Sequence, residues 1–266
     1  MKTNLNEETG MQSESGIRFA VEGGIAVITL ERVARHNALT LHMLDDIARA
    51  VKEVERNDDV RVLRFETASP RFFSSGADIN EWGDIDPQKM GTRFIREGNR
   101  VFRGIAELDI PTIAVLSASA LGGGLELALA CDLRYASVDA KLGFPEASVG
   151  AIPGWMGCAR LAELVGAVRT RELILLGEPI DAARAVAWGI VNEALPADTL
   201  RARVDAVSAL LVGRSRTSLS VGKRLLRLFE TGQAEIAHEL AASVCKASPD
   251  ALEGVAAFRE KRNARF

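Results

Sequence analysis

Apolar residues in this chain of 266 residues occur in short continuous runs and in longer periodic stretches, and the two kinds alternate up to about residue 195. Short runs rich in β-branched residues predict buried strands, whereas apolar positions three and four residues apart predict helices. Strands are predicted over residues 25–30, 60–67, 111–117, 133–137 and 190–195. Helices are predicted behind an N-cap at Thr40 and over residues 125–130 and 160–176. This alternation favours an α/β core.

The strand signals stop at residue 198, and only helical patterns follow. They cover residues 199–211, 216–229 and 234–246, and a last helix begins behind Ser248 with a proline in its first turn. We therefore expect an α/β core over residues 17–197 and a helical region over residues 198–266. Residues 1–16 are polar and rich in Ser and Glu, and we expect them to form a disordered leader.

The composition narrows the classes of function. Apolar residues make up 47% of the chain, which allows a sizeable core, and the net charge of -3 argues against general nucleic-acid or membrane binding. The three cysteines are scattered, as expected for free thiols in a reducing compartment, and no His or Cys pair has metal-binding spacing. The N-terminal residues lack the apolar segment of a secretory signal. We expect a soluble, cytoplasmic protein without a metal site.

Three consecutive glycines, Gly122, Gly123 and Gly124, follow an apolar strand and open a helix. The first amides of a helix have no partner inside it and lie at the positive end of its dipole. One of these amides could therefore stabilise an oxyanion that develops during a reaction. A tight turn with close packing explains the glycines equally well. The spacing matches neither a Walker loop nor a GxGxxG dinucleotide motif.

Two glutamates lie in apolar surroundings. Glu126 is in the segment LELALAC directly after the glycines, and Glu146 is in the segment LGFPEASVG. Burial raises the pKa of a carboxyl group, so such a pair is suited to proton transfer near neutral pH, one acting as acid and the other as base. The alternative for Glu126 is a plain acidic residue that complements a helix N-terminus.

A third glycine-bearing turn occurs in the segment FFSSGADIN, where Gly76 precedes Ala77 and Asp78. The amide of Ala77 could serve as a second oxyanion donor. A helix that simply begins behind an Asp cap is equally consistent with this segment.

Together these loops resemble the crotonase (enoyl-CoA hydratase/isomerase) superfamily. The resemblance is carried by SSGADI at residues 74–79, by ALGGG at residues 120–124 with Glu126, and by GFPE at residues 143–146 followed by GAIPG at residues 150–154. It covers residues 17–266, including the closing EGVAAFREKRNARF. It implies a spiral of repeated ββα turns followed by a C-terminal helical trimerisation region, in a homotrimer or a hexamer made of two trimers.

The resemblance also implies a site and its ligand. An acyl-CoA thioester would bind with its carbonyl oxygen on the amides of Ala77 and Gly123, and Glu126 and Glu146 would be the catalytic acids. Coenzyme A would be part of the substrate, and no separate cofactor is implied. Substrate contacts are implied for the following positions: Arg35, Ala38, Gly76, Asp78, Ile79, Gly122, Pro145 and Gly154.

Retention of both glutamates favours a 2-enoyl-CoA hydratase, in which Glu126 activates water for attack at C3 and Glu146 delivers or removes the C2 proton. Isomerase, dehydratase or hydrolase activity remains open, as does a catalytically idle acyl-CoA-binding homologue or an RNA-binding relative. Two bulky residues, Trp155 and Met156, follow the GAIPG segment, where the family often has Gly at position 156. They either shape the acyl pocket or pack against the next helix. Residues 83–100 are a candidate lid or pocket wall.

Overall fold

The computed structural model describes residues 16–228 and 234–266, so the predicted leader lies almost wholly outside the described residues. The main sheet has six strands in the order β1-β2-β3-β5-β7-β10. β1 and β2 form an antiparallel hairpin, and the remaining pairs are parallel. The strands are β1 (Ile17–Glu22), β2 (Ile25–Leu30), β3 (Val62–Thr67), β5 (Thr112–Leu116), β7 (Leu133–Ser137) and β10 (Glu193–Leu195).

A second sheet has four very short strands in the order β4-β6-β8-β9. They are β4 (Phe72–Ser74), β6 (Ser119–Leu121), β8 (Lys141–Gly143) and β9 (Ile180–Asp181). The two sheets advance together along the chain, because each of β3, β5 and β7 is followed by one strand of the second sheet and then by helix. The predicted spiral of ββα turns is therefore confirmed.

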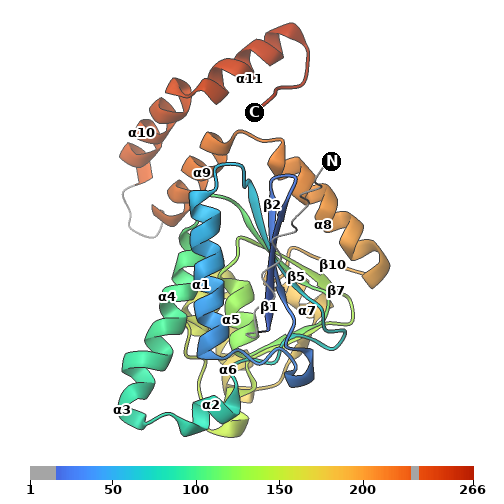
Figure 1. Cartoon of the computed structure of the whole chain (residues 1–266), viewed down its shortest axis with the longest axis vertical. Helices are drawn as coiled ribbons and strands as arrows, with labels where there is room; N and C mark the ends of the chain where they lie inside the picture. The colour runs from blue at the N-terminus through green and yellow to red at the C-terminus, as the bar shows by residue number, and fades with distance from the viewer. Residues whose placement is uncertain (1–15, 229–233) are drawn as a thin grey trace, which may run out of the picture.

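Helices cover both faces of the main sheet (Figure 1). Helices α1 (Leu41–Arg56) and α4 (Arg96–Glu107) pack against each other, and α8 (Ala197–Val212) packs on the opposite face. Every residue of β5 is buried, which explains its continuous apolar run, because a parallel strand covered on both sides has no polar face. Thr40 caps α1 as predicted, with its hydroxyl accepting a hydrogen bond from the amide of Met43 at 3.1 Å.

The remaining helices follow the turns of the spiral. They are α2 (Ile79–Asp84), α3 (Pro87–Lys89), the π-helical segment η2 (Met90–Ile95), α5 (Gly123–Leu129), α6 (Gly157–Leu176, with a kink at Gly166) and α7 (Ala182–Ala187). The two 3-10 turns are η1 (Val33–Arg35) and η3 (Pro145–Val149). Beyond α8, the chain continues as α9 (Arg216–Leu228), α10 (Ala234–Ala247) and α11 (Pro249–Glu260), and the last two extend away from the sheets (Figure 1). Ser248 caps α11, as predicted.

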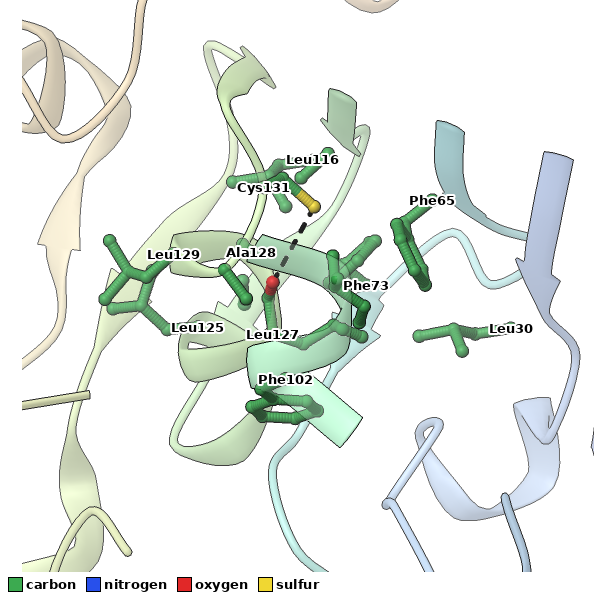
Figure 2. Close-up of a cluster of buried hydrophobic side chains, with 14 of the residues drawn as sticks. Leu30, Phe65, Phe73, Phe102, Leu116, Leu125, Leu127, Ala128, Leu129 and Cys131 are labelled. Atoms are coloured by element: carbon green, nitrogen blue, oxygen red, sulfur yellow. Dashed lines mark hydrogen bonds between the residues drawn. The ribbon is translucent and has the colours of Figure 1, made fainter. Parts of the chain in front are cut away.

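Helix α5 lies in the centre of the molecule, and all seven of its residues are buried. Figure 2 shows it among apolar side chains from β2, β3, β4 and α4, including Leu30, Phe65, Phe73 and Phe102. The thiol of Cys131 lies in the same cluster, 3.7 Å from the carbonyl oxygen of Leu127. Complete burial raises the pKa of this thiol to about 12, so it behaves as a small apolar side chain, as the sequence suggested.

The close approach of α5 to β4 requires glycine at position 124. A Cβ atom there would lie 2.5 Å from the carbonyl oxygen of Ser74, a contact that only a backbone shift would relieve. We predict that Gly124→Ala lowers the free energy of unfolding by about 1–3 kcal/mol because of this overpacking. Urea denaturation would measure the change.

Gly104, in the interior of α4, provides the matched control. A Cβ atom there would meet its nearest neighbour at 4.0 Å, so Gly104→Ala should leave the protein unchanged or stabilise it by up to about 1 kcal/mol through the better helix propensity of alanine. Equal losses in the two variants would contradict the packing assignment at position 124.

Candidate active site

A cavity of about 260 Å³ lies where the N-terminus of α5 meets the turn before α2 and the loop between β8 and α6. Its lining is largely apolar, with two carboxyl groups and several backbone amides. The lining residues are Ser75, Gly76, Ala77, Ile79, Trp82, Phe94, Ile95, Gly122, Gly123, Glu126, Pro145, Glu146, Ser148, Val149, Ala151, Ile152, Gly154 and Trp155.

The cavity has an exposed mouth and a closed end. Ile79 and Ile152 are 51% and 78% exposed, so they lie at the mouth. Phe94 and Trp155 are 2% and 1% exposed, so they form the closed end. A long ligand would therefore enter at the isoleucines with its reacting end toward the aromatic residues.

Two backbone amides come close together in the wall of this cavity. Gly123 is the first residue of α5, so its amide has no acceptor within the helix. Ala77 forms a parallel bridge with Leu39, in which the flanking residues Gly76 and Asp78 make the hydrogen bonds. The amide of Ala77 therefore points away from Leu39, and it lies 3.3 Å from the position that a Cβ atom on Gly123 would take. Two converging amides of this kind can hold a carbonyl oxygen and stabilise it as an oxyanion.

Glu126 lies on the same turn of α5, three residues after Gly123. Its side chain is buried, and its Oε1 atom accepts hydrogen bonds from the amides of Trp155 at 2.7 Å and Gly157 at 2.8 Å. Burial raises the pKa of Glu126 to about 7, although the two amides act in the opposite direction by favouring the charged form. The group can therefore exchange a proton near neutral pH.

Glu146 is held by the short turn η3. Pro145 occupies the first position of that turn, where its fixed φ suits the helical conformation, and Gly150 ends it in the left-handed region at φ 72°. The side chain is half-buried, its Oε2 atom is buried without a hydrogen-bond partner among the described residues, and this partial burial raises the pKa of Glu146 to about 7. An unpartnered carboxyl oxygen in a cavity is costly unless a ligand or a proton satisfies it.

Two glycines leave the space that these carboxyl groups occupy. A Cβ atom on Gly122 would lie 2.8 Å from Oε1 of Glu146, and the φ of Gly122 is 52°. A Cβ atom on Gly157 would lie 2.6 Å from Cγ of Glu126. Any side chain at either position would displace one of the two carboxyl groups.

Most of the residues predicted as substrate contacts line the cavity, namely Gly76, Ile79, Gly122, Pro145 and Gly154. Three others lie outside its lining, and their proposed contacts with a ligand stay predictions. Asp78 caps α2 and pairs with Arg32 at 2.5 Å, and Arg32 also donates to the carbonyl oxygen of Ala38. Arg35 is exposed in turn η1.

Only some of the apolar residues that line the cavity were predicted from the sequence. Trp155 lines the cavity, so of the two alternatives given for this residue the structure supports a place in the pocket wall, and Trp82 lines it as well. Phe94 and Ile95 come from the segment predicted as a lid or pocket wall, and both residues form part of the pocket wall. Val149 and Ile152 were missed, although apolar residues in a loop rich in Gly and Pro are a signal for a binding surface.

The described ranges contain no group of three or more His, Cys, Asp or Glu side chains placed to hold a metal ion. In the same part of the chain, no helix is long and apolar enough to span a membrane.

The sequence of this chain matches a known protein family. A family model described as Enoyl-CoA hydratase/isomerase matches residues 20–266. The chain belongs to this family.

Related proteins match the amino-acid sequence of this chain over nearly its whole length. A probable enoyl-CoA hydratase of Mycobacterium leprae is 37% identical over 91% of this chain and 94% of that protein. A probable enoyl-CoA hydratase of Bacillus subtilis is 34% identical over 95% of this chain and 98% of that protein. The crystal structure of an enoyl-CoA hydratase from Bacillus anthracis superposes with a TM-score of 0.90 at 27% identity, covering 94% of this chain and 98% of that one. As a member of the enoyl-CoA hydratase/isomerase family, the chain is an enzyme of the crotonase fold.

The raised pKa of Glu146 makes stability depend on pH. Between its ordinary value of 4.5 and about 7, the folded state holds a proton on Glu146 that the unfolded state has lost, so stability falls as pH rises through this window. Glu146→Gln replaces the titrating carboxyl group, so the variant should not lose this stability as the pH rises. We predict that at pH 8 the variant exceeds the wild type by roughly 2 kcal/mol in free energy of unfolding, after allowance for partial exposure, and that the gap narrows at pH 5.

Denaturant titrations at the two pH values would measure this difference. Glu53 is exposed on α1, so Glu53→Gln should show no such dependence and serves as the control. A wild type and a Glu146→Gln variant with the same pH slope would mean that Glu146 titrates normally.

Proposed function

We propose that this chain is an enoyl-CoA hydratase, which adds water across the 2,3 double bond of a 2-enoyl-CoA. The observation that carries the proposal is the different hydrogen bonding of the two glutamates around one cavity. Glu126 accepts two amide hydrogen bonds, which favour its charged form, whereas Oε2 of Glu146 accepts none from the described residues. The charge of Glu146 raises the cost of charging Glu126, and burial raises both pKa values to about 7. We therefore assign one retained proton near neutral pH to the pair and, because of the hydrogen bonds to Glu126, place it on Glu146.

This distribution of charge is the one that hydration requires. The thioester oxygen accepts hydrogen bonds from Ala77 and Gly123, which draws electrons from the conjugated double bond. The Glu126 carboxylate takes a proton from water as the water oxygen bonds to C3. The resulting enolate oxygen stays on the two amides while Glu146 gives its proton to C2. Proton exchange with solvent then restores both carboxyl groups.

The proposal predicts that the purified protein hydrates crotonyl-CoA, seen as loss of the absorbance of the conjugated thioester. Glu126→Gln and Glu146→Gln should each lower kcat by about 100-fold or more, because each removes one general acid–base step. Glu53→Gln should retain full activity. Mass spectrometry of the product separates the reactions: hydration adds one water, isomerisation leaves the mass unchanged, and hydrolysis releases free coenzyme A. A product of unchanged mass would replace hydration by isomerisation.

The pH profile tests the roles of the two acids. We expect kcat/KM to be bell-shaped with its maximum near pH 7, falling on the acid side as Glu126 gains a proton and on the alkaline side as Glu146 loses one. The residual activity of Glu146→Gln should lack the alkaline fall. If that variant lacked the acid fall instead, the two roles would be the reverse of those proposed.

A further inference from the structure

The indole of Trp155 is fixed in place at the closed end of the cavity. Its Nε1 atom donates to the carbonyl oxygen of Phe94 at 3.3 Å, and its ring lies between Phe94 and Phe102, with ring centroids 5.2 and 5.5 Å away. Behind it, the indole nitrogen touches the space that a Cβ atom on Gly98 would occupy. A ring packed on three sides cannot swing away to admit a longer ligand.

The other edge of the indole lies beside the reacting centre. Its Cζ3 atom is 2.5 Å from the position of a Cβ atom on Gly123, the residue whose amide is proposed to hold the thioester oxygen. The backbone amide of Trp155 holds Glu126 at the same time. The indole therefore fills the space next to the proposed reacting centre, where the amide of Gly123 would hold the thioester oxygen and Glu126 would act as the base.

The direction in which the substrate lies follows from the shape of the cavity. A volume of about 260 Å³ is below the range of about 300–1,000 Å³ for pockets that enclose a drug-sized ligand, so most of a CoA thioester must remain outside. The nucleotide end leaves through the mouth at Ile79 and Ile152, and the acyl group points toward Trp155. In a cavity of this size, the place of Trp155 sets how far an acyl chain can extend.

We infer that Trp155 is the residue that limits chain length and that this enzyme takes short acyl groups. The inference rests on the proposed function, because it assumes an acyl-CoA thioester on Ala77 and Gly123. Each further methylene would have to displace a side chain that is buried, hydrogen-bonded and enclosed by aromatic rings.

The test compares trans-2-enoyl-CoAs of four, six, eight and ten carbons. In the wild type, kcat/KM should fall by about tenfold or more between the six- and ten-carbon substrates, since one excess methylene in a closed apolar pocket costs about 10–200-fold. In Trp155→Ala, the ratio of kcat/KM for ten carbons to that for four carbons should rise by about tenfold or more. Trp155→Phe keeps an aromatic ring in the core and should fall between the two.

The control is Trp188→Ala, which removes a tryptophan that stacks on Arg184 outside the cavity, with 4.4 Å from the guanidinium carbon to the ring centroid. This variant should keep the chain-length profile of the wild type. If Trp155→Ala does not fold, the wild-type profile and that of Trp155→Phe decide. Equal kcat/KM for four and ten carbons in the wild type would overturn the inference, and so would an unchanged profile in both Trp155 variants.

Binding of saturated acyl-CoAs separates this inference from the proposed function. Calorimetry should show that the wild type binds butyryl-CoA at least tenfold more tightly than decanoyl-CoA, and that Trp155→Ala removes the difference. This result needs no turnover, so it would support the length limit even if the chain hydrated nothing. Equal affinities in the wild type would reject the length limit even if crotonyl-CoA were hydrated.

Discussion

The carboxyl group of Glu126 connects the two parts of the chain on which the site depends. One oxygen of a buried side chain on α5 accepts the amides of Trp155 and Gly157, which lie 29 and 31 residues further along the sequence. A buried carboxyl group without such partners would be expensive, so these two hydrogen bonds hold the loop before α6 against α5. Because Gly123 and Glu126 are three residues apart on one helix, the free amide of Gly123 and the carboxyl group lie on the same face at a fixed separation.

The hydrogen bonds to Glu126 also explain how two glutamates in one cavity can be proposed for different roles. Glu126 comes from a helix in the middle of the core and accepts amides from the loop before α6 and from its first residue, whereas Glu146 comes from a 3-10 turn and lacks a partner for Oε2 among the described residues. Burial raises both pKa values to about 7; two amides from a distant segment favour the charged form of Glu126, whereas for Glu146 only a backbone hydrogen bond of its own residue does so. The backbone around each carboxyl group, and not the residue type, therefore sets its hydrogen bonding, and the proposed division of roles rests on that difference.

Much of the fold could be predicted from the sequence, and the limits of that prediction have physical causes. The strands at residues 25–30 and 133–137 and the helix behind Thr40 were found because apolar runs and helical periodicity are local signals. The four strands of the second sheet were missed because they have two or three residues each, too few to show a period, and because their pairing is set by distant segments. The predicted boundary of the helical region at residue 198 falls within α8, which packs on the sheet through Leu200 and Val204.

In the site too, features with a local sequence signal could be predicted, and features set by distant residues could not. Glu126 and Glu146 could be recognised because a carboxyl group among apolar residues is a local anomaly. The difference between them could not be seen, because it depends on amides from residues 155 and 157. The place of Trp155 depends likewise on Phe94 and Gly98, which lie some sixty residues earlier in the sequence.

The proposed binding site for the thioester oxygen is made only of backbone atoms, the amides of Ala77 and Gly123. No single codon change can delete a main-chain amide, other than a change to proline, so this part of the chemistry is shielded from most mutations. The walls at Trp82, Ile95, Ile152 and Trp155 are side chains and have no such protection. In an evolving lineage, the choice of substrate can therefore drift from one mutation to the next while the means of activating the thioester is inherited intact.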